Sequence, residues 1–460
     1  MISCSAVERC VCCGSEVFRR TLDLGRQPLA NAFRKSSSPA EENGRKGFQQ
    51  DEQQDRQQGR QQDHPQDHPL ALQTCLSCWH SQLTHCVDRN AMFTDYAYAS
   101  GTSNTLRSYF SWFASSLRRG LGLRKARVLE IAANDGSLIR ALQACGVEAI
   151  GIDPAANLVI PARREGLPVM PGTWPRDASL LGSEPYDVIL GLNVLAHVCD
   201  PLQFLQGCAA RLGENGVVVV QTSQARMFSR GEFDTCYHEH FSFFNTRSMQ
   251  RLAARAGLAV QRSMLVGIHG DSALWFLGRS EQHARDLASA FTEGEFYLPE
   301  DLQDFEASCG IFEESTYHRF AERTQTLLAK LRMVVQEHRS RGYLVVFVGA
   351  AAKAITVLHA SGIVPDRFLD EAPLKIGAFV PGLDLRVEAL EVLRSLHRPA
   401  LLVITAWNFR AELVDKIRRI GIASASVFYT YFPEELMLGS DAEASSTNWV
   451  DPAAGSHAPC

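Results

Sequence analysis

The sequence predicts an α/β fold built around a doubly wound, open parallel sheet, and three observations support this class. Residues 128–142 run from a short apolar strand, through a turn that contains Gly136, into a segment with apolar residues at helical spacing. Residues 147–153 form a second apolar run, which ends in Asp153. Strand-like and helix-like segments then alternate as far as residue 222. Strand, turn and helix form the repeating unit of such sheets.

The composition is that of a chain with about three domains of ~150 residues. It has 460 residues, 45% of them hydrophobic and 21% charged. The net charge of −5 gives no basic field that would attract nucleic acid or an anionic membrane. No apolar run reaches the roughly 18–20 residues that span a bilayer, and the first residues do not resemble a signal peptide. We therefore expect a cytoplasmic protein that binds neither nucleic acid nor a membrane.

Residues 8–90 are predicted to form a zinc-binding module. They carry two Cys-x-x-Cys pairs, Cys10 with Cys13 and Cys75 with Cys78, and four thiolates suffice for a closed tetrahedral zinc site. The Gln-rich insert at 36–67 explains the long gap between the pairs, and its composition predicts disorder. Cys12 is an alternative ligand, and the spare candidates are Cys86, His80 and His85.

The chain has thirteen cysteines, an odd count. In a chain without a secretion signal, reduced thiols and a metal site are expected in place of a disulfide framework. Free thiols without metal are the alternative to the zinc site.

The turn after residue 131 is the candidate cofactor site of a domain at 91–280. It has one glycine and lacks the Gly-x-Gly-x-x-Gly spacing that suits a pyrophosphate. Asp153 ends the second strand, where a carboxylate can accept hydrogen bonds from both hydroxyls of a ribose. An adenosine-containing cofactor without phosphates fits best, although an ordinary turn with no ligand is the alternative. The pattern is similar to the first motif of class I S-adenosylmethionine-dependent methyltransferases. The candidate cofactor residues are Glu130, Ala132, Asn134, Gly136, Asp153 and Asn193.

The run Tyr237-His238-Glu239-His240 is the most reactive stretch of the sequence. Its two histidines are one residue apart, so they do not match the His-Glu-x-x-His zinc motif. A histidine with a neighbouring carboxylate suits a general base, because its pKa lies near neutrality. A packing cluster is the alternative, and His197, in the strand region at 186–198, has a capping or packing role as its alternative.

Together these motifs resemble the three-domain sugar C-methyltransferases, which act on nucleotide-linked keto-deoxysugars. The resemblance runs nearly end to end. Besides the cysteine pairs and the Tyr237–His240 run, it rests on segments 27–31, 130–136, 151–154, 193–198 and 269–272.

The resemblance implies methyl transfer from S-adenosylmethionine to a sugar carbon next to a ketone. His240 would be the base that removes the α-proton, and Glu239 and Tyr237 would assist it or hold the ketone oxygen. Tyr98 matches a tyrosine of the substrate pocket. The other residues that we assign to the substrate are His197, His269, Ser272 and Lys353.

Two departures from the family pattern leave the substrate open. Asp271 stands where the family has glycine, and Trp275 lies in a changed continuation of that segment. A methyltransferase with another small-molecule substrate is therefore one alternative. A catalytically silent, zinc-containing binding protein is the other.

Residues 281–437 are predicted to form a second Rossmann-like domain, which by the resemblance helps to hold the nucleotide. A long helix at 303–340, with a possible break at 308–310, precedes a strand at 343–348. The turn after this strand can present backbone N–H groups to a diphosphate, with Lys353 adding charge. A unit kept only for packing is the alternative. Residues 438–460 are predicted to be a disordered tail.

Overall fold

The computed structural model describes residues 2–35, 67–94, 96, 99–102, 104–223, 225–268, 272–292, 295–433 and 435–439. The predicted disorder of the Gln-rich insert and of the tail therefore concerns residues that lie almost wholly outside the described ones. No helix in the described part of the chain is long and apolar enough to cross a membrane.

The N-terminal module is built from antiparallel strands. Its four-stranded sheet has the order β11-β4-β3-β2, and a separate pair joins β1 to β5. These strands are β1 (Cys4–Ala6), β2 (Phe18–Gln27), β3 (His68–Cys75), β4 (Ser81–Leu83), β5 (His85–Val87) and β11 (Ser242–Phe243). Strand β11 directly follows the Tyr237–His240 run, and it pairs with β4 through Ser242 opposite Gln82. The module is thus joined by backbone pairing to the segment that carries the candidate base.

The middle domain has an eight-stranded sheet of order β14-β12-β13-β10-β9-β6-β7-β8. Its strands are β6 (Val128–Ile131), β7 (Ala149–Asp153), β8 (Val169–Pro171), β9 (Tyr186–Leu192), β10 (Leu212–Ser223), β12 (Ala259–Val266), β13 (Ser272–Gly278) and β14 (Glu295–Tyr297). Helices cover both faces, because the buried residues of the sheet divide into two sets. One set packs with α4 (Asn104–Leu121), α5 (Ser137–Ala144) and α10 (Glu281–Ala288), and the other with α7 (Pro201–Arg211) and α9 (Thr246–Arg255).

The predicted parallel topology holds for five of the eight strands of this sheet and is wrong for the other three. Strands β8, β7, β6, β9 and β10 are parallel, but β13, β12 and β14 are antiparallel to their neighbours. Only residues 267–271 separate β12 from β13, too few for the crossover that a parallel pair needs. Residues 213–216, whose sequence Gly-Glu-Asn-Gly is typical of a turn, lie within β10, whose register shifts between Leu212 and Val217.

The C-terminal domain has a six-stranded sheet of order β17-β16-β15-β18-β19-β20, in which only β20 is antiparallel. The strands are β15 (Leu344–Val348), β16 (Arg367–Asp370), β17 (Val387–Ala389), β18 (Ala400–Ile404), β19 (Val427–Thr430) and β20 (Leu436–Gly439), with helices α13 (Ala352–Ser361) and α14 (Arg410–Ile420). The predicted break in the long helix is confirmed: α11 (Pro299–Ser308) ends before α12 (Glu314–Ser340) begins.

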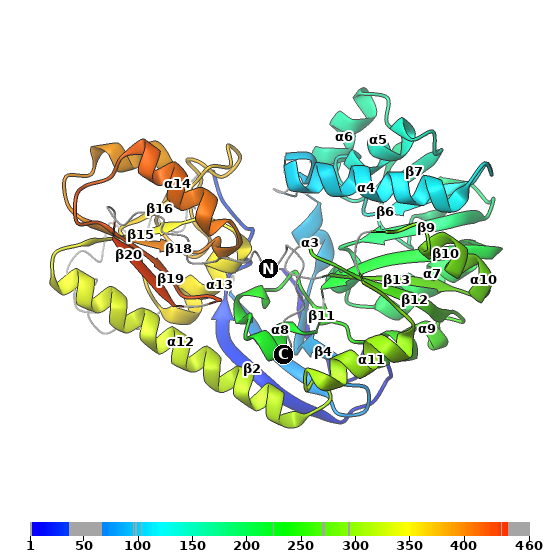
Figure 1. Ribbon diagram of the computed structural model, residues 1–460, viewed down its shortest axis with the longest axis horizontal. Coiled ribbons are helices and arrows are strands. Elements are labelled where there is room, and N and C mark those ends of the chain that lie inside the picture. Colours follow the sequence, from blue (N-terminus) through cyan, green and yellow to red (C-terminus); the bar gives the residue numbers. More distant parts are fainter. Residues whose placement is uncertain are drawn as a thin grey trace.

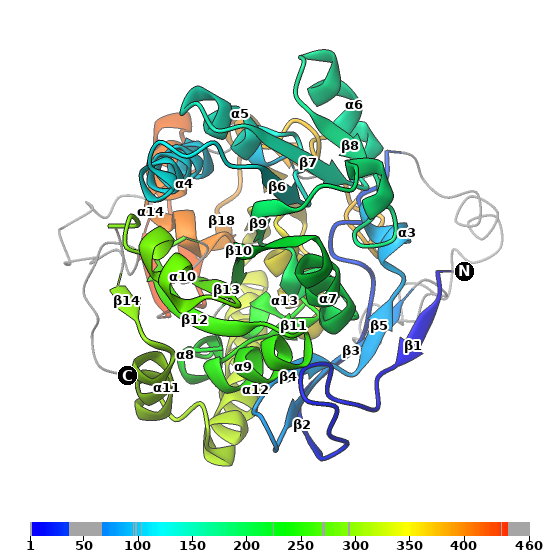
Figure 2. The ribbon, with the colours of Figure 1, turned by 90° about the vertical axis from the view of Figure 1, so that its right-hand side faces the viewer.

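One hydrophobic cluster joins the three parts. Figure 1 shows the middle domain on the right and the C-terminal domain on the left, with β2 and α12 running beneath them, and Figure 2 shows the same arrangement from the side. Leu22 of the module, Phe233 and Phe241 of the middle domain, and Val345 and Trp407 of the C-terminal domain belong to a single buried cluster. Residues 233–243 therefore lie where all three parts meet.

Candidate active site where the three parts meet

The cofactor loop after β6 is a sharp turn with an unusual backbone. Ala132, Asn134 and Gly136 have positive φ angles of 60°, 52° and 74°. A Cβ atom at position 136 would lie 2.7 Å from Leu167 Cδ1, so the turn requires glycine there. Asn193, at the end of β9, also has a positive φ of 58°. Both loops follow strands whose carboxyl ends lie at the same edge of the sheet, where α/β folds bind ligands.

Asp153 holds the cofactor loop in place. Its Oδ2 accepts a hydrogen bond from the Asn134 backbone N–H at 2.8 Å, and its Oδ1 accepts one from the Ala155 N–H at 2.8 Å. The side chain is 6% exposed, and burial raises its pKa although the two backbone bonds lower it. Each carboxylate oxygen has two lone-pair sites, so Asp153 keeps acceptor capacity for the hydroxyls of a ligand.

Glu130 is the second carboxylate of this edge. It is 5% exposed, and its Oε2 atom has no hydrogen-bond partner among the described residues. Burial, together with the charges of Asp153 and Asp135, raises its pKa well above the usual value. A buried acceptor without a partner is costly unless a ligand supplies the donor. The loop therefore fits an adenosine-containing cofactor that brings hydroxyl donors and no phosphate.

His240 has a fixed tautomer. Its Nδ1 lies 3.0 Å from the carbonyl oxygen of Thr235, which can only accept, so Nδ1 carries the hydrogen when the ring is neutral. Its Nε2 lies 2.6 Å from the hydroxyl of Tyr237, which donates to it. The ring of His197 stacks on His240 with centroids 5.2 Å apart, and Phe93 stacks on His197 at 5.8 Å. Nε2 is thus the nitrogen available as a base.

Glu239 is the point where several parts of the chain converge. Its Oε1 accepts a hydrogen bond from Asn31 Nδ2 at 2.6 Å, and its Oε2 accepts one from the Tyr96 hydroxyl at 3.0 Å. The side chain is 4% exposed. Burial raises its pKa, while these two bonds and the charges of Arg89 and Lys375 lower it. The site thus combines the module, the middle domain and the C-terminal domain.

The two cations near Glu239 are themselves held by carbonyl groups. Lys375 Nζ donates to the Ala350 carbonyl at 2.9 Å, and burial lowers the pKa of this lysine although Asp370 and Glu239 raise it. Arg89 donates to the His238 carbonyl at 2.8 Å, and burial lowers its pKa to about 10.

His238 lies apart from this cluster although it is next to Glu239 in sequence. It is buried, and its Nε2 lies 3.2 Å from the His68 carbonyl. Burial lowers its pKa to about 4, so it stays neutral at pH 7. Its contacts are those of a packing residue.

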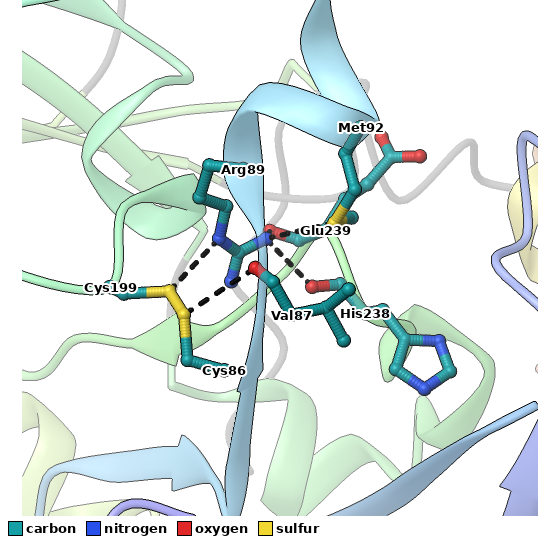
Figure 3. The surroundings of a disulfide bond; sticks show 7 residues. All are labelled: Cys86, Val87, Arg89, Met92, Cys199, His238 and Glu239. Carbon is teal, nitrogen blue, oxygen red and sulfur yellow. Dashed lines mark hydrogen bonds between the residues drawn. A yellow bond between two sulfur atoms is a disulfide. The ribbon is translucent and has the colours of Figure 1, made fainter. Parts of the chain in front are cut away.

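A disulfide lies beside the site, so the expectation of reduced thiols is wrong for this pair, while nine cysteines of the described residues are free. Cys86, a spare candidate ligand for zinc, is bonded to Cys199 with the two Cα atoms 6.0 Å apart. Figure 3 shows Arg89 between this disulfide and the carbonyls of His238 and Glu239, and its Nε lies 3.1 Å from Cys199 Sγ. The two cysteines are 113 positions apart, and only the pairing of the module with the middle domain brings them together.

The two cysteine pairs form one cluster of four thiols. The sulfur atoms of Cys10, Cys13, Cys75 and Cys78 all lie within 4.8 Å of one another. Cys10 and Cys78 are 3.6 Å apart, as are Cys13 and Cys75. Four ligands at the zinc–sulfur distance of about 2.3 Å would lie roughly 3.8 Å apart in a tetrahedron, so the cluster fits zinc. The alternative and spare candidates do not belong to the cluster; these are Cys12, His80, His85 and Cys86.

The other candidate residues are placed as follows. Lys353 Nζ is buried without a hydrogen-bond partner among the described residues, 4.1 Å from the centroid of the Trp407 ring. Ser272 is buried, and its hydroxyl donates to the Ile268 carbonyl at 3.1 Å. Tyr98, His269 and Asp271 lie outside the described residues.

Four residues near Glu239 were not among the predicted site residues; they donate hydrogen bonds at the site or lower the pKa of Glu239 through their charge: Asn31, Tyr96, Arg89 and Lys375. Two of them left a signal in the sequence: Asn31 ends the segment 27–31 that carries part of the family resemblance, and Tyr96 belongs to the stretch 95–103, which is rich in tyrosine and hydroxyl side chains.

Comparison with known proteins agrees with this architecture. A protein-family model described as a methyltransferase domain matches residues 103–263, and one described as a C-methyltransferase C-terminal domain matches residues 268–433. The C-methyltransferase NovU of Streptomyces niveus is 26% identical over 380 residues, which cover 81% of this chain and 88% of NovU. A ubiquinone biosynthesis O-methyltransferase of Bradyrhizobium diazoefficiens is 32% identical over 99 residues, which cover 21% of this chain and 39% of that one.

Among solved structures, the magnesium protoporphyrin IX methyltransferase of Synechocystis PCC 6803 with bound S-adenosylmethionine has 16% identity and a TM-score of 0.30, and the match covers 38% of this chain and 79% of that one. The two adjoining family matches and the relative of similar length agree on the reaction class of the enzyme. It is an S-adenosylmethionine-dependent C-methyltransferase with a class I methyltransferase domain and a second α/β domain.

Proposed function

We propose that this enzyme methylates a carbon next to a ketone of a nucleotide-linked deoxysugar, with His240 as the base. One observation carries the proposal: the Thr235 carbonyl accepts the Nδ1 hydrogen of His240, so that Nε2 carries the lone pair, which accepts a hydrogen bond from the Tyr237 hydroxyl. Nε2 takes the proton from the carbon next to the ketone, and the electron pair of that bond forms an enolate. The bound cofactor supplies an electrophilic methyl group to the enolate carbon.

Tyr237 is proposed to act on the ketone oxygen of the substrate, and Glu239 on one of its sugar hydroxyls. The Tyr237 hydroxyl is 2.6 Å from Nε2, within reach of any group that Nε2 deprotonates. When the substrate replaces this bond, the hydroxyl can donate to the ketone oxygen, whose charge grows as the enolate forms. Glu239 is fixed by Asn31 and Tyr96, which suits a carboxylate that accepts a hydrogen bond from a sugar hydroxyl.

We propose that the cofactor is held at the edge formed by β6, β7 and β9. Asp153 would accept hydrogen bonds from the ribose hydroxyls, and the unpartnered Oε2 of Glu130 would accept one from a donor of the cofactor. The loops at Ala132–Gly136 and at Asn193 would bring backbone close to it.

The substrate is proposed to reach from this site toward the C-terminal domain. His197 stacks on the base, and Lys353 lies near the start of α13, where a cation can meet a diphosphate. We retain Ser272, His269 and Tyr98 as proposed substrate residues. The four clustered cysteines are proposed to bind one structural zinc ion, which would fix the module against α9 of the middle domain.

The test is an incubation of the purified enzyme with S-adenosylmethionine and a nucleotide-linked keto-deoxysugar, followed by mass spectrometry of the product. We expect one added methyl group, located on a carbon next to the ketone. The matched control is the same sugar nucleotide with its ketone reduced to an alcohol, which has no acidic α-proton. Methylation of the control, or a methyl group on oxygen, would contradict the proposal.

A further inference from the structure

Asp234 accepts hydrogen bonds from two side chains of the C-terminal domain. It lies four residues after the end of α8 (Met227–Arg230). It lies in the 3₁₀ turn η4 (Phe233–Thr235) and is 1% exposed. Its Oδ2 accepts a hydrogen bond from Trp407 Nε1 at 2.7 Å and one from the Tyr431 hydroxyl at 2.9 Å. Trp407 follows β18 and Tyr431 follows β19, so both donors belong to the C-terminal sheet.

The backbone carbonyl groups of the next two residues, Thr235 and Cys236, both have hydrogen-bond partners. The Cys236 carbonyl accepts a hydrogen bond from the Thr356 hydroxyl of α13 at 3.1 Å. The Thr235 carbonyl, which lies between these two anchor points, is the group that faces His240 Nδ1 at 3.0 Å. Side chains of the C-terminal domain therefore form hydrogen bonds with Asp234 and Cys236, the residues on either side of Thr235. The Thr235 carbonyl between them faces Nδ1 of the imidazole.

This arrangement has a consequence for the chemistry at Nε2. A neutral imidazole has one hydrogen bonded to nitrogen, and the hydrogen-bond partner of Nδ1 decides which of the two nitrogens carries it. If the Thr235 carbonyl moves away, the ring loses the bond that places the hydrogen on Nδ1. The hydrogen can then move to Nε2, and a ring in that form has no lone pair on Nε2 that could accept a proton from the substrate.

We propose that Trp407 and Tyr431 are positioning residues for His240, which act through Asp234 and the Thr235 carbonyl. The inference rests on the proposed role of His240 as the base, and it adds that the C-terminal domain sets the tautomer and orientation of that base. A role in domain packing alone would leave the imidazole unchanged as long as the protein stays folded.

The test compares the tautomer of His240 in the full-length protein and in the variant Trp407→Phe/Tyr431→Phe. Both substitutions keep an aromatic ring in the core and remove the hydrogen-bond donor. Tyr431→Phe removes only the hydroxyl, whereas Trp407→Phe also removes part of the buried ring system. Nitrogen NMR of protein with labelled histidines reports which ring nitrogen is protonated, and the His240→Ala variant assigns the signals. We expect the form protonated at Nε2 to rise about threefold to tenfold, the fold-change that corresponds to the loss of one neutral hydrogen bond.

The matched control is Tyr429→Phe, two residues before Tyr431, because the Tyr429 hydroxyl donates to Glu435 and not to Asp234. This variant should leave the His240 signals as they are. S-Adenosylmethionine affinity, measured by calorimetry, should be the same in all variants, because the cofactor edge lies in the middle domain.

An unchanged tautomer in a double variant that still binds the cofactor would overturn the inference. If the double variant does not fold, Trp407→Phe and Tyr431→Phe singly give the same comparison. Failure of the proposed function is a separate result: full turnover in His240→Ala would remove the base role, while the NMR comparison would still decide whether the C-terminal domain orients the ring.

Discussion

The bond between Asn31 and Glu239 crosses from the module to the middle domain, and it should have a measurable pH dependence. Asn31 Nδ2 donates to Glu239 Oε1 at 2.6 Å, and the carboxylate is 4% exposed, so solvent screens the bond little. We consider the substitution Asn31→Ala, which removes this donor and leaves Tyr96 on the other oxygen.

The magnitude follows from the charge of the acceptor. A hydrogen bond to a charged group contributes about 1.5–3 kcal/mol, against roughly 0.5–1.5 kcal/mol for a neutral one. Burial raises the pKa of Glu239, so its acid form is favoured in the folded state and the free energy of unfolding falls as pH rises from the usual glutamate value through the raised pKa. Asn31 opposes this fall because its bond favours the ionised form. The cost of Asn31→Ala should therefore rise as Glu239 ionises, from roughly 0.5–1.5 kcal/mol for its acid form to about 1.5–3 kcal/mol for its carboxylate, and so be larger at pH 8 than at pH 5.

Urea unfolding of the full chain at both pH values measures the difference. In a Glu239→Gln background the cost of Asn31→Ala should be the same at pH 5 and pH 8, because nothing at position 239 then titrates. The control Gln27→Ala removes a buried amide of the same segment that donates to the Leu24 carbonyl, so its cost should not depend on pH either. An equal cost of Asn31→Ala at both pH values in the wild-type background would refute this reasoning.

Three further predictions concern the cofactor, the metal and the disulfide. Asp153→Ala should weaken S-adenosylmethionine binding by about 1.5–3 kcal/mol in calorimetry, the scale of charged hydrogen bonds, and unchanged affinity would remove Asp153 from the site. The purified protein should contain about one zinc per chain, which Cys75→Ser should lose and Cys12→Ser should keep; metal analysis that finds no zinc in protein prepared without chelators would contradict this. Peptide mapping without reductant should recover Cys86 linked to Cys199, and reduction should lower the free energy of unfolding by roughly 2–4 kcal/mol; two free thiols in the map would refute the pairing.

Features that depend on near neighbours in sequence could be predicted. The strand at 128–131, its turn and the following helix are found as predicted, because an apolar run, a glycine with positive φ and helical spacing are all local signals. The spacing within each Cys-x-x-Cys pair is likewise a local signal. The cluster of four thiols could be predicted from the two pairs on the assumption that they meet in the fold. The break before α12 was visible for the same reason.

Features that depend on pairing between distant segments could not be predicted. Asn31 lies 208 positions from Glu239, and an isolated asparagine gives no hint of its partner. The antiparallel strands β12 and β13 differ from parallel ones only in how they connect, which periodicity does not report. The disulfide of Cys86 joins two regions that the hydrophobic pattern assigns to separate domains.

The central claim is that His240 removes the proton next to the ketone, and hydrogen exchange tests it most directly. The enzyme is incubated in D₂O with a nucleotide-linked keto-deoxysugar and without S-adenosylmethionine, and deuterium at the α-carbon is followed by mass spectrometry. Wild-type enzyme should catalyse exchange, and His240→Ala should reduce it by ~10²–10⁴-fold, the usual contribution of a general base, while it still binds sugar and cofactor. His238→Ala, the matched control at a packing histidine, should retain most of the exchange. Exchange at the wild-type rate in His240→Ala would contradict the claim and place the base elsewhere.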